Sequence, residues 1–129
     1  MKGLFVLAVY TLLAAGIAFA QDITGDWNGT LITGEGSFRL VLHLARNADG
    51  TLKATLDSID QGVKAIPVTS AKLSKSQLTL KVDSVHGTYD GKVDAEASEI
   101  DGTWNQGAPL PLTYRRGGIT QKADWGDSA

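Results

Sequence analysis

Hydrophobic and polar residues alternate with a period of two along most of the stretch from Ile23 to Arg116. Turn-forming residues interrupt the alternation at intervals of roughly eight to twelve positions, which is typical of an all-β sandwich or barrel. The clearest stripe runs from Phe38 to Leu44, with Arg39 and His43 on the opposite face. Eight strands are predicted, around residues 27–31, 38–44, 52–56, 63–73, 78–82, 89–95, 100–106 and 110–114.

Three local signals add detail to this pattern. The sequence Asn47-Ala48-Asp49-Gly50 predicts a hairpin turn in which the glycine takes the positive φ. Asp60-Gln61-Gly62 interrupts the alternation before the fourth segment. Within that segment Pro67 has no amide proton to donate, so we expect a bulge or a sheet edge there.

The close spacing of the strands determines how they pair. Parallel pairing needs connections of roughly a dozen residues or more, so these strands are predicted to form an antiparallel sheet. Consecutive hairpins favour an up-and-down barrel that is closed or nearly closed. A barrel of this size encloses either a packed interior or one small ligand. A two-sheet sandwich built from the same strands is the alternative.

The first 20 residues have the pattern of a secretion signal. Lys2 supplies the positive charge, residues 4–17 form an uncharged apolar run, and Ala18-Phe19-Ala20 is a small-x-small cleavage site. A retained anchor is the alternative, because the run approaches the roughly 20 residues that span a bilayer. The polar Gln21-Asp22 that follows favours cleavage. We therefore expect a periplasmic or secreted protein with no membrane attachment after signal cleavage.

The remaining chain divides into two parts. Residues 21–116 are predicted to form a single β-barrel domain, since they contain all of the alternating segments. Residues 117–129 are rich in glycine and polar side chains, and we expect them to form a flexible C-terminal tail.

Charge and cysteine content exclude several classes of protein. The 129 residues include 12 Lys and Arg, 14 Asp and Glu, two His and no Cys. Removing residues 1–20 takes away Lys2 and leaves 11 basic against 14 acidic residues, a net charge of −3. This balance argues against nucleic-acid binding, which needs a basic surface. Without cysteine there is no disulfide scaffold and no thiolate site. We expect a monomer that depends on its hydrophobic core.

No catalytic motif is recognisable in the sequence. Gly34-Glu35-Gly36-Ser37-Phe38 comes nearest to a nucleophile elbow, but it lacks the second glycine and lies in a predicted hairpin turn. His43 and His86 have no His or carboxylate at ligand spacing on the same face, so no zinc site is expected. Asp57 and Asp60 flank a turn, where aspartate commonly bonds to the local backbone. We therefore expect a protein that is not an enzyme and has no cofactor.

Several polar and aromatic side chains are predicted to point into the barrel. Such groups either find a hydrogen-bond partner locally or are directed at a ligand, while the aromatic ones also serve as core plugs. The loop 57–62 adds polar groups at a strand exit. We expect a small apolar or amphipathic ligand inside the barrel. The inward polar and aromatic set is Trp27, Ser58, Ser84, Tyr89, Trp104 and Gln106. The candidate ligand-binding residues are Ser58, Asp60, Gln61, Tyr89, Trp104 and Gln106.

An ordered series of motifs resembles a known family. The series is Gly25-Asp26-Trp27-Asn28-Gly29, the leucine-rich second strand, the stretch 52–62 ending Asp-Ser-Ile-Asp-Gln-Gly, Tyr89-Asp90-Gly91, the stretch 100–107 and Pro109-Leu110-Pro111-Leu112. Together the motifs resemble the small β domain that precedes the catalytic domain in secreted bacterial α/β-hydrolases of the esterase and peptidase type. The resemblance covers nearly all of residues 22–116.

In that family the hydrolytic residues belong to the following domain. Too few residues follow Arg116 to form such a domain, so none of the hydrolytic residues is carried over. The resemblance implies a stand-alone accessory or binding module. An interaction module that docks or regulates a secreted hydrolase or protease is the alternative.

A looser likeness involves two tryptophan motifs. Gly25-Asp26-Trp27-Asn28 and Gly102-Thr103-Trp104-Asn105-Gln106 are similar to motifs of avidin and lipocalin-like barrels. In those families the tryptophan of the first strand packs across the base of the barrel, which implies a structural, barrel-closing role for Trp27. Biotin pockets use several tryptophans, and residues 21–116 contain only these two, so biotin is not the expected ligand.

Overall fold

The computed structural model of this chain describes residues 22–116, which form nine β-strands and one short 3-10 helix. The elements in chain order are β1 (Gly25–Thr33), β2 (Gly36–Arg46), β3 (Leu52–Ser58), β4 (Val63–Val68), β5 (Ser70–Ser74), β6 (Gln77–Val82), η1 (Asp83–Val85), β7 (Gly87–Val93), β8 (Glu99–Asn105) and β9 (Pro109–Arg116).

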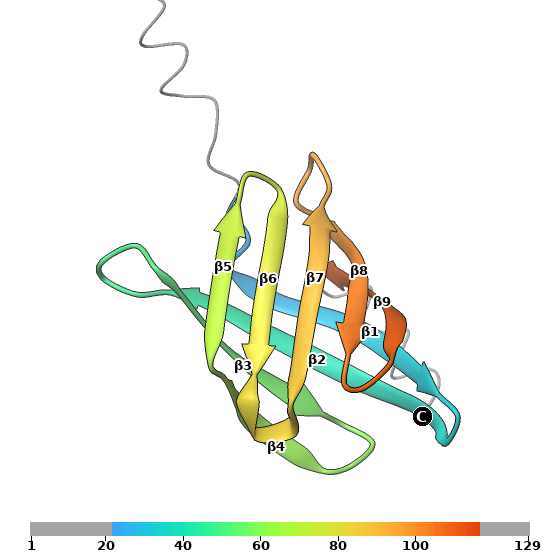
Figure 1. The fold of residues 1–129 in the computed structure, drawn as a ribbon. Coiled ribbons are helices and arrows are strands. Elements are labelled where there is room, and N and C mark those ends of the chain that lie inside the picture. The colour runs from blue at the N-terminus through green and yellow to red at the C-terminus, as the bar shows by residue number, and fades with distance from the viewer. Residues whose placement is uncertain (1–21, 117–129) are drawn as a thin grey trace, which may run out of the picture.

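All nine strands belong to one antiparallel sheet with the order β4-β3-β2-β1-β9-β8-β7-β6-β5. Neighbouring strands are consecutive hairpins, except that β1 also pairs with β9. The sheet curls so far that β5, β6 and β7 cross in front of β1 and β2 (Figure 1). The result is a nearly closed barrel, as predicted, and the sandwich alternative is wrong because all strands share one sheet.

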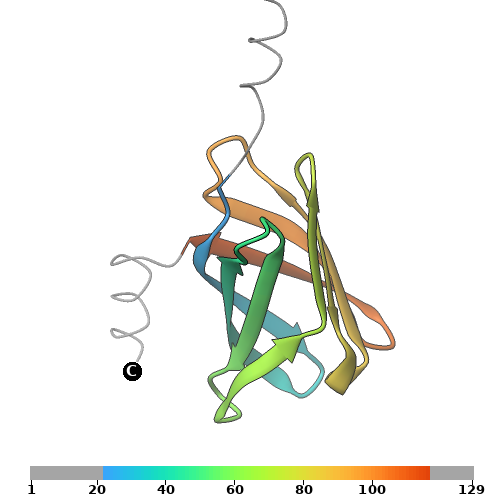
Figure 2. The ribbon, with the colours of Figure 1, turned by 90° about the vertical axis from the view of Figure 1, so that its left-hand side faces the viewer.

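The seam of the barrel lies where β4 passes directly into β5. These strands are the two ends of the sheet and do not pair, although β3 lies close to β5 and β4 close to β6. Figure 2 faces this side of the molecule. At Thr69 the chain leaves β3 and joins β6, with the Thr69 amide donating to the Lys81 carbonyl at 2.7 Å.

The prediction of eight strands is therefore corrected to nine, because the segment 63–73 divides at this corner. The expectation for Pro67 is confirmed: β4 is an edge strand, and its register with β3 shifts between Leu56 and Ser58. A residue without an amide proton fits an edge because the outward side of the strand makes no ladder bond.

The inward face of each strand forms the core, as the alternation predicts. Trp27, Leu42, Leu80 and Tyr89 are among the fully buried side chains. Two of the predicted inward residues are exposed instead. Ser84 lies in η1 and Gln106 lies beyond the end of β8, because the period-two rule stops where the strand stops.

Tyr89 and its neighbours fill the middle of the barrel. The Tyr89 hydroxyl donates to the carbonyl of Leu112 at 2.8 Å and contacts that of Ile100 at 3.3 Å. Its ring meets Tyr114 edge-on, with centroids 5.2 Å apart. A Cβ at Gly102 would overlap the backbone of Asp90 and Gly91 and also the Tyr89 ring, so β8 has no room for a side chain there.

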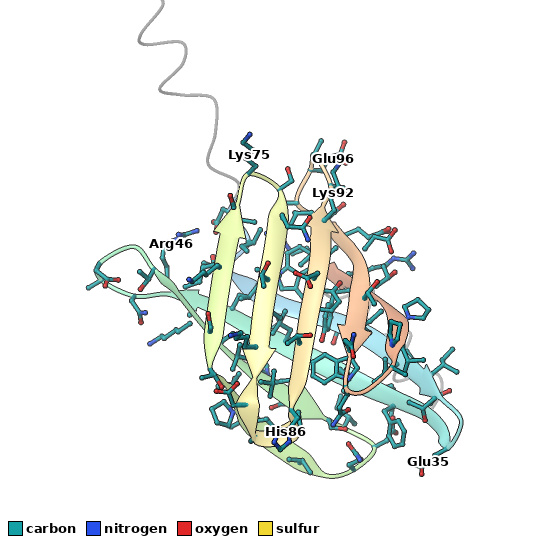
Figure 3. The ribbon with its side chains drawn as sticks, in the orientation of Figure 1. Glu35, Arg46, Lys75, His86, Lys92 and Glu96 are labelled. Carbon is teal, nitrogen blue, oxygen red and sulfur yellow. The ribbon has the colours of Figure 1, made fainter. Side chains whose placement is uncertain are left out.

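The two ends of the barrel differ in what closes them. Glu35 and His86 mark one end and Lys75 and Glu96 the other (Figure 3). Toward the second end, the buried indole of Trp27 donates from Nε1 to the Ile23 carbonyl at 2.9 Å.

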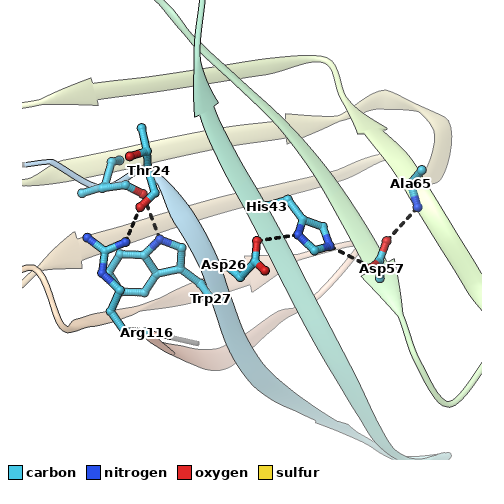
Figure 4. A network of polar contacts seen from close by, with 8 residues as sticks. Thr24, Asp26, Trp27, His43, Asp57, Ala65 and Arg116 are labelled. Atoms are coloured by element: carbon cyan, nitrogen blue, oxygen red, sulfur yellow. Dashed lines mark hydrogen bonds and ion pairs between the residues drawn. The ribbon is translucent and has the colours of Figure 1, made fainter. Parts of the chain in front are cut away.

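Arg116 covers the Trp27 ring, with its guanidinium carbon 4.4 Å from the ring centroid (Figure 4). The same guanidinium donates to the carbonyls of Asp22, Thr24 and Ala97. These contacts join the start of the described chain to its end. They are consistent with the structural role expected for Trp27.

The predicted signal at 1–20 and the predicted tail at 117–129 lie outside the described residues. Within residues 22–116, the structure has no helix with the length and apolar character needed to traverse a membrane.

Candidate functional site

A cavity of about 510 Å³ lies at the end of the barrel marked by Glu35. This volume falls in the range of roughly 300–1,000 Å³ that is usual for small-molecule sites. The β1–β2 hairpin, β3, β4, η1 and the end of β8 contribute its wall. The lining residues are Leu31, Thr33, Gly34, Glu35, Phe38, Leu40, Leu56, Ser58, Gln61, Ile66, Val85, Trp104 and Gln106.

Apolar side chains form most of this wall. Leu31, Leu40 and Leu56 are buried residues from three adjacent strands, so they continue the core into the cavity. Trp104 faces them from β8 and is also buried. A ligand bound here would therefore lie against the same apolar face that the period-two pattern predicts.

Ser58 and Gln61 form a polar pair in the wall. Ser58 is only 3% exposed, and its hydroxyl donates to Gln61 Oε1 at 2.5 Å. Gln61 itself is exposed on the loop after β3. Its Nε2 atom has no protein acceptor in the part of the chain that the structure describes, so two N–H donors are left for water or a ligand.

Gln106 fixes the orientation of Trp104. Its Oε1 accepts from the Trp104 indole at 3.2 Å, and its Nε2 donates to the Val85 carbonyl at 2.9 Å. One amide thus links β8 to η1 across the cavity wall. Its donor and acceptor atoms each have a protein partner.

The structure brings four of the six predicted ligand-binding residues together. Ser58, Gln61, Trp104 and Gln106 all line the cavity. Asp60 and Tyr89 do not.

Asp60 points to β2, where Oδ1 accepts from the Arg39 guanidinium at 2.8 Å and Oδ2 from the Arg39 amide at 2.7 Å. The guanidinium holds the pKa of Asp60 below its ordinary value, chiefly through the side-chain hydrogen bond. Tyr89 is buried in the middle of the barrel, and burial raises the pKa of its hydroxyl. Neither residue lines the cavity, so the structure does not place these two with the other four candidates.

Sequence reasoning missed the hairpin residues 33–35, Ile66 and Val85. The sequence of residues 33–35 predicts only an ordinary hairpin turn. Val85 lies in a single turn of 3-10 helix between two strands. Nothing local marks them as neighbours of Trp104. The one available signal was the predicted up-and-down order of the strands, which places alternate loops at the same end of a barrel.

A second polar cluster lies on the outer face of the barrel. His43 in β2 bonds through Nδ1 to Asp26 Oδ1 at 2.7 Å and through Nε2 to Asp57 Oδ2 at 2.8 Å (Figure 4). Asp57 Oδ1 in turn accepts from the amide of Ala65 at 2.7 Å, and Ala65 has a positive φ of 57°. The cluster therefore connects β1, β2, β3 and β4.

This arrangement corrects two expectations. His43 does have carboxylates on its own face, since cross-strand pairing supplies them, and Asp57 and Asp60 bond to β2 and β4 rather than to their own turn. No group of three or more His, Cys, Asp or Glu able to hold a metal occurs within residues 22–116.

Charge and burial oppose each other in this cluster. Partial burial by itself lowers the pKa of His43, but the hydrogen bonds to Asp57 and Asp26 outweigh it, so the pKa lies above its ordinary value. For Asp57, burial tends to raise the pKa, but the hydrogen bonds from Ala65 and His43 outweigh that effect and lower it. The two groups thus favour an ion pair.

Comparison of the chain with protein-family models, with curated proteins and with solved structures finds no match. The likeness to the β domain of secreted hydrolases stays a prediction from the sequence motifs.

Proposed function

We propose that this protein is a secreted, non-catalytic binding module that holds one small apolar or amphipathic molecule at the end of its barrel. The observation that carries the proposal is the cavity itself, with Leu31, Leu40, Leu56 and Trp104 in its wall and the Ser58–Gln61 pair beside them. An apolar pocket with a few convergent polar groups is the usual form of a small-molecule site.

The bonding of the polar side chains supports binding rather than catalysis. Both ring nitrogens of His43 bond to carboxylates on the outer face. The Ser58 hydroxyl donates to Gln61, so it is not activated by a basic group as a nucleophile would be. The groups near the cavity are arranged to contact a molecule and to fix its orientation.

The test is saturable binding of N-phenylnaphthylamine, an uncharged dye that fluoresces when it leaves water. We expect one dye per chain. Ile66→Phe, which fills the cavity, is expected to weaken binding by about tenfold or more. Val68→Phe is the matched control, because Val68 lies two residues along β4, is half-buried against the same core, and does not line the cavity.

Absence of saturable binding, or an Ile66→Phe variant that folds and binds like the wild type, would contradict the proposal. Native mass spectrometry of the protein purified from the periplasm adds an independent readout. A small mass lost on denaturation identifies the class of the natural ligand. An intact mass equal to that of a chain beginning at Gln21 tests export and signal cleavage.

The loop after β3 favours a second candidate function, docking of a secreted hydrolase or protease. Ile59 and Val63 are 39% and 43% exposed at the mouth of the barrel, where such apolar side chains are available to a partner. Ile59→Ser with Val63→Ser should abolish co-elution with a secreted esterase or peptidase and leave dye binding intact. If the wild-type protein does not co-elute with any such enzyme, the docking function is contradicted.

A further inference from the structure

We infer that the cavity selects a ligand whose polar end is an uncharged hydrogen-bond acceptor, such as an acyl ester, and discriminates against the corresponding carboxylate. The inference rests on the proposed function, because it names the chemical class that the same site holds. It follows from the charges, donors and acceptors of the cavity wall.

The first observation is the absence of a counter-charge for an anion. Of the described residues that line the cavity, none is Lys, Arg or His, and the one charged residue is Glu35. Arg39 lies on the neighbouring part of β2, but its guanidinium forms an ion pair with Asp60 at 2.8 Å. A carboxylate entering this wall would lose water without gaining a cation, which is unfavourable.

The second observation is the donor that Gln61 presents. Its Oε1 atom is held by the Ser58 hydroxyl, which fixes the amide so that Nε2 is the atom left for a ligand. Nε2 carries N–H donors only. A carbonyl oxygen is the complementary group, and it enters an apolar wall at a much lower desolvation cost than an ion.

The third observation argues against a cationic end. An ammonium group needs several acceptors, and the amide oxygens of Gln61 and Gln106 each already use one of their two lone pairs, on Ser58 and Trp104. Glu35 is an acceptor, yet it is exposed on the hairpin tip, where water screens its charge. The wall therefore suits a neutral acceptor best.

The experiment is displacement of N-phenylnaphthylamine by three ligands with an unbranched ten-carbon chain: methyl decanoate, decanoate and decylammonium. All are used at neutral pH below their critical micelle concentrations. We expect methyl decanoate to displace the dye at about tenfold lower concentration than either ion, as one added hydrogen bond and an avoided charge burial would give. Decanoate or decylammonium binding as well as the ester overturns the inference, and so does failure of all three to displace bound dye.

A pair of variants tests the role of Gln61. Gln61→Glu keeps an acceptor for Ser58 but replaces the free N–H donors with an anionic oxygen, so the ester should bind about tenfold more weakly. Gln77→Glu is the matched control, an exposed glutamine on β6 that does not line the cavity. Equal ester affinity in the two variants overturns the inference. If the dye itself does not bind to wild-type protein, the proposed function fails instead, so the two failures are distinguishable.

Discussion

The six-membered ring of Trp104 occupies the space that a side chain at Gly87 would need. A Cβ at position 87 would overlap Cη2 and Cζ2 of the indole. Trp104 on β8 lines the cavity, and Gly87 begins the neighbouring strand β7, with one residue between it and the end of η1. The position of the main aromatic wall of the cavity therefore depends on the absence of a side chain on the next strand.

Gly87→Ala should disturb this wall. The indole is buried and held by Gln106, so the overlap is relieved only by repacking, and we expect a loss of about 1–3 kcal/mol in the free energy of unfolding. Dye binding should weaken as well, because Trp104 must shift. Chemical denaturation and dye titration measure the two effects.

Gly34→Ala is the control for that substitution. Gly34 also lines the cavity, but a Cβ there has open space around it. Its effect on stability should stay within about 0.5 kcal/mol. A Gly87→Ala protein as stable as Gly34→Ala would show that the indole is not confined as described.

Loss of the hydroxyl should change the free energy of unfolding differently for the two buried tyrosines. Tyr89→Phe removes the donor to the Leu112 carbonyl and should cost about 1–2 kcal/mol. Tyr114 is equally buried, but its hydroxyl has no hydrogen-bond partner in the described part of the chain, so Tyr114→Phe should be neutral or stabilising. Denaturant unfolding of both variants decides the point, and an equal loss in the two would contradict it.

Arg116 should be irreplaceable by lysine. The planar guanidinium stacks on Trp27 and donates to three carbonyls at once, which a single ammonium group cannot reproduce. We expect Arg116→Lys to lower stability by about 1–2 kcal/mol.

The adjacent Arg115 supplies the control. Its side chain is 66% exposed and pairs with Glu99 at 3.3 Å, so Arg115→Lys should change stability by less than about 0.5 kcal/mol. Thermal unfolding of the two lysine variants compares them directly. Equal unfolding midpoints in the two variants would contradict the structural role assigned to the stacking of Arg116 on Trp27.

The His43 cluster predicts a pH dependence with a definite sign. The raised pKa of His43 means that its contribution is complete below the unfolded value of about 6.5 and is lost as the pH rises through the folded value. The lowered pKa of Asp57 means that its contribution is present above about 3.9 and is lost as the pH falls through the folded value. Stability from this cluster should therefore be greatest in mildly acidic solution.

The measurement is the free energy of unfolding from about pH 6 to about pH 9. His43 is 38% exposed, so solvent screening limits the decline to about 1 kcal/mol or less. His43→Gln should flatten the profile. His86→Asn, at the exposed left-handed position after η1, should leave it unchanged. A wild-type profile that does not fall, or that falls equally in both variants, would contradict the assignment.

The strand pattern was predictable because alternation is a local property. In a strand, residues two apart share a face whatever the strand pairs with, so Trp27, Tyr89 and Trp104 could be placed inside from the sequence. The turn at residues 47–50 was equally local: Gly50 has a φ of 91°, and its amide donates to the Asn47 carbonyl at 2.9 Å. The prediction of Ser58 as a buried polar residue follows from the same rule.

Pairing partners and shared ends of the barrel are properties of the whole chain, and only the tertiary structure decided them. The segment 63–73 packs Ile66 and Val68 on the core before Thr69 and Ala71 and Leu73 after it, and at Thr69 it changes neighbours and becomes two strands. His43 meets Asp26 because the two residues are register partners, which spacing along the chain does not reveal.

The same reason explains which candidate residues share the site. Asp60 and Gln61 are adjacent in the sequence, yet one side chain bonds to Arg39 and the other lines the cavity with Ser58 and Trp104. The sequence by itself determined an antiparallel β-barrel with aromatic residues inside, because burial alternates along a strand. The curl of the sheet determined where the cavity lies and which residues line it, because the curl brings loops that are distant in sequence to one end of the barrel.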